Sequence, residues 1–182
     1  MAKFMKISAA VVTFSAFLLT PSYFFLPSAF LLSITITAWT FSYHLFMRLA
    51  VGWIIDRIMH NQANCYHNWF TLKNFEYKLY RFLKIRKWKG KMPTYSPELF
   101  DCSKHSYIEI AQAMCQAEIV HECIIALSFM PVILTIFFHG FWAFFSTSLA
   151  AALLDSLFVM MQRYNRPRIL KLAERKNQHS SP

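Results

Sequence analysis

The chain has 182 residues, of which 56% are hydrophobic and 18% aromatic, and its formal net charge is +10. This composition excludes a disordered chain, and the length favours one domain over residues 1–182. A charge of +10 suits either nucleic acid or a membrane surface. The distribution of the charge along the chain therefore decides between these two classes of partner.

Four apolar runs lie at about residues 7–26, 28–50, 119–138 and 141–161. Each approaches the ~20 residues that a helix needs to span the hydrocarbon core. A nucleic-acid-binding module has no use for such runs, so we expect no nucleic-acid partner. The sequence predicts an all-α integral membrane protein. Its four transmembrane helices form two hairpins, joined by a basic amphipathic cytosolic segment over about residues 56–117.

The basic residues predict the orientation in the membrane. All 19 Lys and Arg lie outside the two short connections, Pro21–Pro27 and His139-Gly140. The positive-inside rule then predicts a multi-pass protein of the cell membrane with both termini in the cytosol. The four cysteines have no CxxC spacing and map to the cytosolic side or the inner half of the membrane, where reduced thiols are expected.

The first apolar run follows Lys3 and Lys6, as in a signal peptide, but it lacks a convincing small-residue cleavage site. We therefore expect an uncleaved first helix. Pro21 and Pro27 are expected to bracket the turn after it, because proline cannot donate a hydrogen bond inside a helix. The second helix is expected to continue to about Ile58, where aromatic and basic residues indicate its exit from the bilayer.

A basic and aromatic stretch follows the second helix. Its helical spacing predicts one apolar face, with cations on its sides and back. Such a helix can lie in the membrane interface, although a basic helix packed on protein or a basic arm on nucleic acid has the same pattern. The face comprises Leu72, Phe75, Leu79, Phe82 and Leu83; the cations are Lys73, Lys78, Arg81, Lys84, Arg86, Lys87, Lys89 and Lys91.

The next helix is expected to begin near Lys104, capped by Asp101 or Ser103, and to enter the membrane as one piece. Where it enters, three ionisable residues share a face: Glu118, His121 and Glu122. A carboxylate one turn from an imidazole can orient it and stabilise its protonated form, as a general base requires. The alternative is an interfacial ion cluster paired with nearby cations.

Glu118-x-x-His121 also matches half of a di-iron carboxylate site, but the chain has no second Glu-x-x-His, so no metal and no cofactor is predicted. Asp155, inside the fourth run, requires a partner or a cavity. His121 and an arginine beyond Met161 are the candidate partners. The arginines at that exit, with Asn165, can bind phosphate or carboxylate groups or anchor the chain on acidic lipids.

Three blocks carry a resemblance to a known family, in this order: KNFEYKLYRFLKIRKWKGKMP, the AEIVHE helix before a Pro-containing membrane run, and MQRYNRPRIL. Together they resemble the glycosyl-4,4'-diaponeurosporenoate acyltransferase family of staphyloxanthin biosynthesis, over roughly Trp69 to Leu170. The resemblance implies a membrane O-acyltransferase of carotenoid biosynthesis. Such an enzyme esterifies the sugar of a glycosylated carotenoid acid with a fatty acyl group.

Acyl transfer to a sugar hydroxyl needs a base at the hydroxyl and hydrogen-bonding or cationic groups at the acyl carbonyl and the donor phosphates. We expect His121 with Glu118 or Glu122 to supply the base. The expected substrate-binding residues are Trp69, Lys87, Trp88, Asn165, Arg166 and Arg168, and residues 84–91 are expected to hold an acyl-CoA or acyl carrier protein donor.

Membrane lipids and a glycosylated lipid acceptor complete the expected partners. Two alternatives stay open. One is an acyltransferase or other lipid-modifying enzyme with a non-carotenoid acceptor. The other is a non-catalytic membrane adaptor whose basic segment binds anionic lipid.

Overall fold

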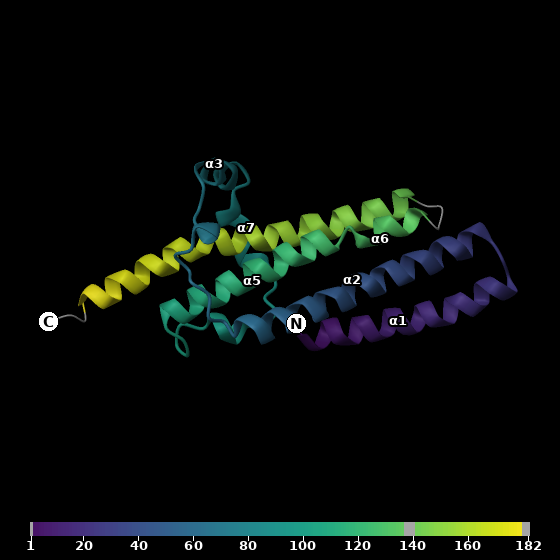
Figure 1. The fold of residues 1–182 in the computed structure, drawn as a ribbon, viewed down its shortest axis with the longest axis horizontal. Helices are drawn as coiled ribbons and strands as arrows, with labels where there is room; N and C mark the ends of the chain where they lie inside the picture. Colours follow the sequence, from purple (N-terminus) through teal and green to yellow (C-terminus); the bar gives the residue numbers. More distant parts are fainter. Residues whose placement is uncertain (1, 137–140, 180–182) are drawn as a thin grey trace. The chain divides into compact units, whose positions relative to one another are not determined.

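The computed structural model describes residues 2–136 and 141–179. It is 83% helical, and the described residues contain no strand, which confirms the all-α class. The helices are drawn in Figure 1. In chain order they are α1 (Ala2–Phe25), α2 (Ala29–Met59), η1 (Asn68–Phe70), α3 (Asn74–Phe82), α4 (Ile85–Trp88), η2 (Lys89–Lys91), η3 (Pro97–Phe100), α5 (Tyr107–Leu127), α6 (Met130–Ile133), η4 (Leu134–Ile136) and α7 (Phe141–His179).

Four helical stretches are long and apolar enough to cross a membrane, as expected of a multi-pass membrane protein: Lys3–Phe25, Ala29–Met59, Tyr107–Ile136 and Phe141–Gln178. The second ends at Met59, which confirms the predicted extension past the apolar run. The third and fourth stretches are longer than the predicted runs, because polar turns continue the same helices. The predicted connection at His139-Gly140 lies outside the described residues.

The chain divides into two compact units. The first comprises Met1–Trp53 and Cys123–Asp155, and the second comprises Ile54–Glu122 and Ser156–Pro182. The first unit thus holds most of the predicted transmembrane runs, and the second holds the basic segment and every predicted site residue.

Polar contacts join helices inside the first unit. The hydroxyls of Thr13 on α1 and Ser42 on α2 lie 2.5 Å apart, and the Tyr43 hydroxyl donates to the Leu127 carbonyl at 2.9 Å. Asp155, which is 2% exposed, accepts a hydrogen bond and an ion pair from Arg48 of α2. A buried carboxylate needs such a charge partner. Arg48 was not among the partners predicted for Asp155.

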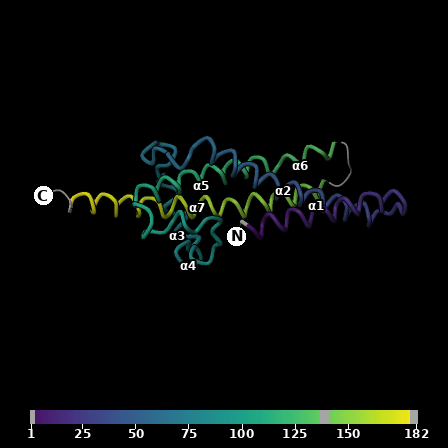
Figure 2. Tube along the Cα trace, turned by 90° about the horizontal axis from the view of Figure 1, so that it is seen from below, coloured from purple at the N-terminus to yellow at the C-terminus, as the bar shows by residue number. Residues whose placement is uncertain are grey.

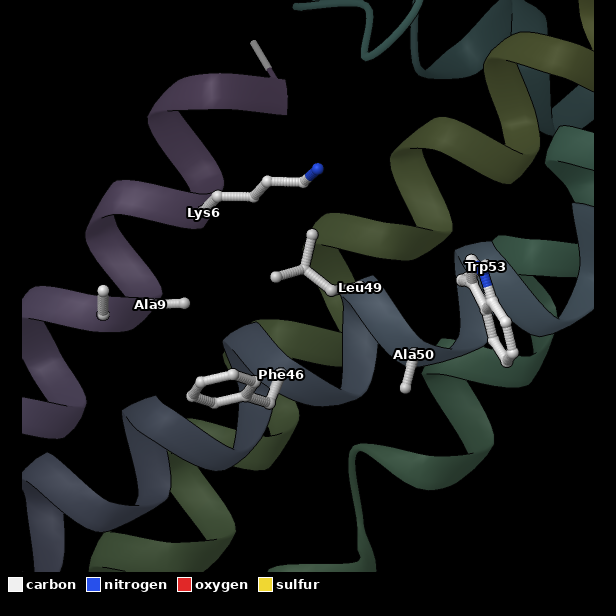
Figure 3. Close-up of a pocket in the computed structure, with 7 residues that line it drawn as sticks. Lys6, Ala9, Phe46, Leu49, Ala50 and Trp53 are labelled. Atoms are coloured by element: carbon white, nitrogen blue, oxygen red, sulfur yellow. The ribbon is translucent and has the colours of Figure 1, made fainter.

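An open apolar groove runs between α1 and α2 in the same unit. Lys6 and Ala9 on α1 face Phe46, Leu49 and Ala50 on α2 across it (Figure 3). Lys6 is the one charged side chain among the residues that line this groove.

The second unit has a small apolar core between the loop after α2 and the first half of α5. Its buried residues are Ala63, Cys65, Phe70, Ala111 and Cys115, and Met59, Ile119, Ile169 and Leu170 pack against them. The N-terminal half of α5 and the C-terminal half of α7 lie side by side here, with α3 and α4 beside the middle of α7 (Figures 1 and 2). This arrangement brings residues about ninety positions apart into contact.

Three local predictions were wrong. Pro21 lies inside α1 rather than in the turn, because a proline near the end of a membrane helix removes only one backbone hydrogen bond. The cap before α5 is Ser106, which exchanges two hydrogen bonds with Glu109 in a capping box. Asp101 instead accepts from the Ser103 backbone at 2.9 Å and closes a turn.

The third wrong prediction concerns the basic segment, which is not one helix. α3 ends at Phe82, and α4 begins at Ile85 after Lys84, whose φ of 50° is left-handed. The indole of Trp88 donates to the Leu83 carbonyl at 3.0 Å and satisfies one of the acceptors that the helix end leaves unpaired. Ile85 is thereby buried completely, and this burial favours the break.

Candidate functional site

A buried ion network forms the centre of the second unit, where α5 meets α7. Glu118 on α5 is fully buried, and Arg166 on α7 is 1% exposed. One Glu118 oxygen accepts from Arg163 at 2.5 Å, and the other accepts from Arg166. Each carboxylate oxygen therefore has its own guanidinium, which is the condition for keeping a charge inside a protein.

Arg163 connects this centre to α3 and to the segment before it. Its Nε and Nη2 donate to both oxygens of Glu76 at 2.6 and 3.0 Å, in a bidentate pair. Its remaining donors reach the Trp69 carbonyl at 3.0 Å and the Thr71 carbonyl at 3.1 Å, besides Glu118. All five N–H groups of Arg163 are thus used, so the guanidinium is held rigidly.

Glu76 is the second carboxylate of the network. Besides Arg163, it accepts from the Tyr80 hydroxyl at 2.7 Å and from the Lys73 backbone N–H at 2.7 Å. Burial acts to raise the pKa of Glu76, but the hydrogen bonds from Arg163, Lys73 and Tyr80 outweigh it and hold this pKa below the usual value. Burial and the Glu76 carboxylate raise the pKa of the Tyr80 hydroxyl, so Tyr80 stays a neutral donor.

Arg166 fixes the short helix η1. It donates to the Phe70 carbonyl, and its guanidinium lies 4.9 Å from the centre of the Phe70 ring. Phe70 belongs to the apolar core, so the same arginine joins the ion network to that core. Two arginines and two glutamates therefore balance in charge and bind the segment from Trp69 to Glu76 onto α5 and α7.

His121 lies three residues after Glu118 on α5, and its side chain is partly buried. Its ring stacks on Phe158 of α7, with the ring centres 4.7 Å apart and an interplanar angle of 6°. This stacking fixes the plane of the imidazole. The Glu118 carboxylate beside it is bound to Arg163 and Arg166.

Glu122 and Trp69 were predicted separately, and the structure brings them together. The Trp69 indole N–H donates to Glu122 Oε2 at 2.9 Å. Trp69 is 58% exposed as a residue, while the polar edge of its ring is fixed by this bond. The exposed Trp69 is thus attached to α5 at the residue that follows His121 in the sequence.

A second cluster lies around Tyr164, on the side of α7 towards η2. Arg168 lies over the Tyr164 ring at 3.7 Å from its centre, and Lys89 lies 5.2 Å from the same centre. The Lys89 ammonium also donates to Asn165 Oδ1 at 2.5 Å. The Tyr164 ring in turn meets the Tyr80 ring edge-on at 6.3 Å, which connects the cluster to the ion network.

The remaining predicted substrate residues have different surroundings. Lys87 is exposed on α4, and Trp88 supports the chain break through its bond to the Leu83 carbonyl. Arg166, predicted to bind a ligand, is buried against Glu118, whereas Asn165 and Arg168 lie in the Tyr164 cluster.

Within residues 2–136 and 141–179, no group of three or more His, Cys, Asp or Glu side chains is placed to hold a metal ion.

Sequence reasoning missed two members of the network. Glu76 is the single acid among the eight cations between Lys73 and Lys91, and Arg163 belongs to the basic end of the fourth apolar run, but neither was predicted as a site residue. The isolated acid was the available signal, because a lone carboxylate kept within a basic stretch suggests a specific cationic partner.

The chain matches the family described as glycosyl-4,4'-diaponeurosporenoate acyltransferase over residues 66–175. It belongs to this family. The match begins just before Trp69 and ends beyond Arg168, so it encloses the ion network, His121 and the Tyr164 cluster. It confirms the predicted family and supports an acyltransferase role. Comparisons with curated proteins and with solved structures find no match.

Proposed function

We propose that the protein is a membrane O-acyltransferase that transfers a fatty acyl group to a sugar hydroxyl of a glycosylated lipid, at the cytosolic face of the cell membrane. The observation that carries this proposal is the family match over residues 66–175, which coincides with the buried network and with His121 and Trp69 beside it. The acceptor implied by the family name is a glycosyl-4,4'-diaponeurosporenoate, a glycosylated carotenoid acid.

Trp69, which is bound to the residue that follows His121, suits such an acceptor. Sugars present apolar ring faces together with hydroxyls, and the exposed Trp69 ring offers a matching flat surface. Glu122, through Trp69 Nε1, fixes the orientation of this ring. We assign Trp69 to the sugar ring and His121 to the hydroxyl that reacts.

The proposed reaction needs one base and one leaving group. His121 takes the proton of the sugar hydroxyl as its oxygen attacks the carbonyl carbon of an acyl thioester, from acyl-CoA or acyl carrier protein. The tetrahedral intermediate collapses, the C–S bond breaks, and the imidazolium returns the proton to the leaving thiolate. Glu122 is the carboxylate that we assign to stabilise the imidazolium. Glu118 is held by two arginines and is assigned to position α5 against α7.

The donor side is assigned to the basic residues near the exit of α7. Asn165 and Arg168 lie in a half-exposed cluster, and Lys87 and Trp88 belong to the adjoining α4. Arg166 contributes indirectly, by fixing the Phe70 carbonyl and therefore the turn that carries Trp69.

The test of this proposal is acyl transfer by membrane fractions supplied with glycosylated carotenoid acid and varied acyl-CoA. His121→Ala should lower kcat about 10²–10⁴-fold, since a positioned base contributes about that factor. His105→Ala is the matched control, because His105 precedes α5 and lies outside the network. Full activity of a well-expressed His121→Ala protein would remove the base assignment. Lipid extraction and mass spectrometry from cells with and without the gene identifies the acylated product.

A further inference from the structure

Two cations lie over one aromatic ring in the second unit. Arg168 covers the Tyr164 ring, Lys89 lies over the same ring, and the charge of a third cation, Arg86, acts on Lys89. Among residues 2–136 and 141–179, no carboxylate forms an ion pair with any of the three. Like charges brought together without an acid repel, so this arrangement has a free-energy cost.

The electrostatics of Lys89 report this cost. Burial, and then the charges of Arg168 and Arg86, lower the pKa of the Lys89 ammonium. An exposed lysine would avoid these neighbours by turning into water. Lys89 is instead held by Asn165 Oδ1 at 2.5 Å and by the Tyr164 ring. Lys89 is therefore positioned by the protein rather than left free on its surface.

The framework under the cluster is rigid. Tyr164 meets Tyr80, whose hydroxyl donates to Glu76 inside the ion network. Arg168 donates to the Tyr164 carbonyl at 2.5 Å, one turn earlier on α7. The remaining guanidinium and ammonium donors of Arg168 and Lys89 are available to an anion, and a dianion would remove the repulsion that the cluster stores.

From this geometry we infer that Lys89 and Arg168, arranged around Tyr164, form a binding site for a phosphoryl group. One source of the phosphoryl group is a phosphopantetheine-type acyl donor such as coenzyme A. In that case the site deepens the proposed function and rests on it. A phospholipid headgroup offers the same chemistry. Lys89 thereby gains a role as a ligand-binding residue, and Asn165 acts by orienting Lys89.

The experiment measures binding without catalysis, so its failure is distinct from failure of the proposed function. The full chain is placed in nanodiscs of neutral lipid and titrated with coenzyme A and with pyrophosphate by calorimetry. Lys89→Gln and Arg168→Gln should each weaken binding of both probes about tenfold or more, because each removes a charge-assisted hydrogen bond to a phosphoryl oxygen. Asn165→Asp should also weaken it, since it places a carboxylate beside Lys89.

Two matched controls each remove an exposed cation that lies in the second unit but outside residues 84–91. Lys78→Gln alters α3, and Arg175→Gln alters an exposed turn of α7 two turns beyond Arg168. Both should bind the probes like the unaltered protein. Thermal unfolding of each variant establishes that it is folded.

A second arm distinguishes the source of the phosphoryl group. The same variants are placed in nanodiscs containing phosphatidylglycerol, and native mass spectrometry counts the retained lipid. Loss of coenzyme A binding in the two site variants supports the donor. Loss of retained phosphatidylglycerol in those variants, with no coenzyme A binding by any protein, supports a lipid phosphate and rejects the donor. Equal binding of all ligands by the site variants and the controls would overturn the site.

Discussion

Glu76 illustrates how one residue holds a segment in place. Its two oxygens accept from Arg163 twice, from the Tyr80 hydroxyl and from the Lys73 backbone. The backbone bond starts α3, and the Arg163 bonds attach α3 to α7. Removing one partner of such a buried pair leaves the other charge partly uncompensated, which costs about 3–5 kcal/mol.

The folded state holds the pKa of Glu76 below its usual value, and this fixes the sign of a pH effect. A lowered folded pKa means that the unfolded chain binds the proton more readily, so the stabilisation is complete above the unfolded value of about 4.3 and is lost as pH falls through the folded pKa. We expect Glu76→Gln to lower the melting temperature in detergent at pH 7, and to show a smaller further loss between about pH 5 and pH 3 than the unaltered protein.

The control for this pair of measurements is Glu98→Gln. Glu98 lies on η3 and is exposed, so its removal should leave both the melting temperature and its acid dependence unchanged. An equal acid-induced loss in Glu76→Gln and in the unaltered protein would assign the effect to other carboxylates.

At the scale of the elements, the break between α3 and α4 determines which faces of the basic segment are exposed. α3 buries Glu76 and Tyr80 against the protein and leaves Phe75 and Phe82 exposed, at 62% and 81%. An exposed aromatic pair beside several cations suits a helix that lies in the membrane interface. This is the use predicted for the whole segment, and α3 retains the pattern over its nine residues.

Lys84 is the position where the break can be tested. Its φ of 50° is tolerated poorly by β-branched side chains and well by glycine. Lys84→Gly and Lys84→Val remove the same charge, so the difference in stability between them reports the effect of the backbone conformation at residue 84. We expect the free energy of unfolding of Lys84→Val to be about 1–2 kcal/mol lower than that of Lys84→Gly. Thermal unfolding of both variants in detergent measures this difference. Equal stability of the two variants would mean that α3 and α4 can join into one helix.

At the scale of the whole molecule, the distribution of charge predicts the topology. The basic clusters lie at the N-terminus, at the end of α2, in residues 73–91 and in the last third of α7, whereas the turn before α2 is uncharged. Reporter fusions at Leu26 should be extracytoplasmic, and fusions at Gly90 and Gln178 should be cytosolic. A cytosolic reporter at Leu26, or an external one at Gln178, would reject the two-hairpin arrangement.

The local part of this structure was predictable from the sequence. Four apolar stretches specify four long helices, because a backbone in hydrocarbon must pair all its polar groups internally. The continuation of α2 past the apolar run was also predictable, because aromatic and basic residues typical of a membrane interface follow the run directly. The family was recognisable from short blocks with a distinctive order, and the match over residues 66–175 confirms it.

The partners of the buried charges were decided by tertiary structure alone. Arg163 and Glu76 are 87 positions apart, and no periodicity links a residue on α7 to one on α3. Arg166 has the sequence features of a ligand-binding arginine, yet packing of α5 against α7 buries it on Glu118. Asp155 has Arg48 as a partner for the same reason, since α2 and α7 meet inside the first unit.

Sequence alone determined which residues carry charge and which segments are helical. Only the fold determined which charges neutralise one another and which, like Lys89 and Arg168, stay available to a ligand. The reason is that charge pairing depends on short distances between residues that are far apart in the sequence.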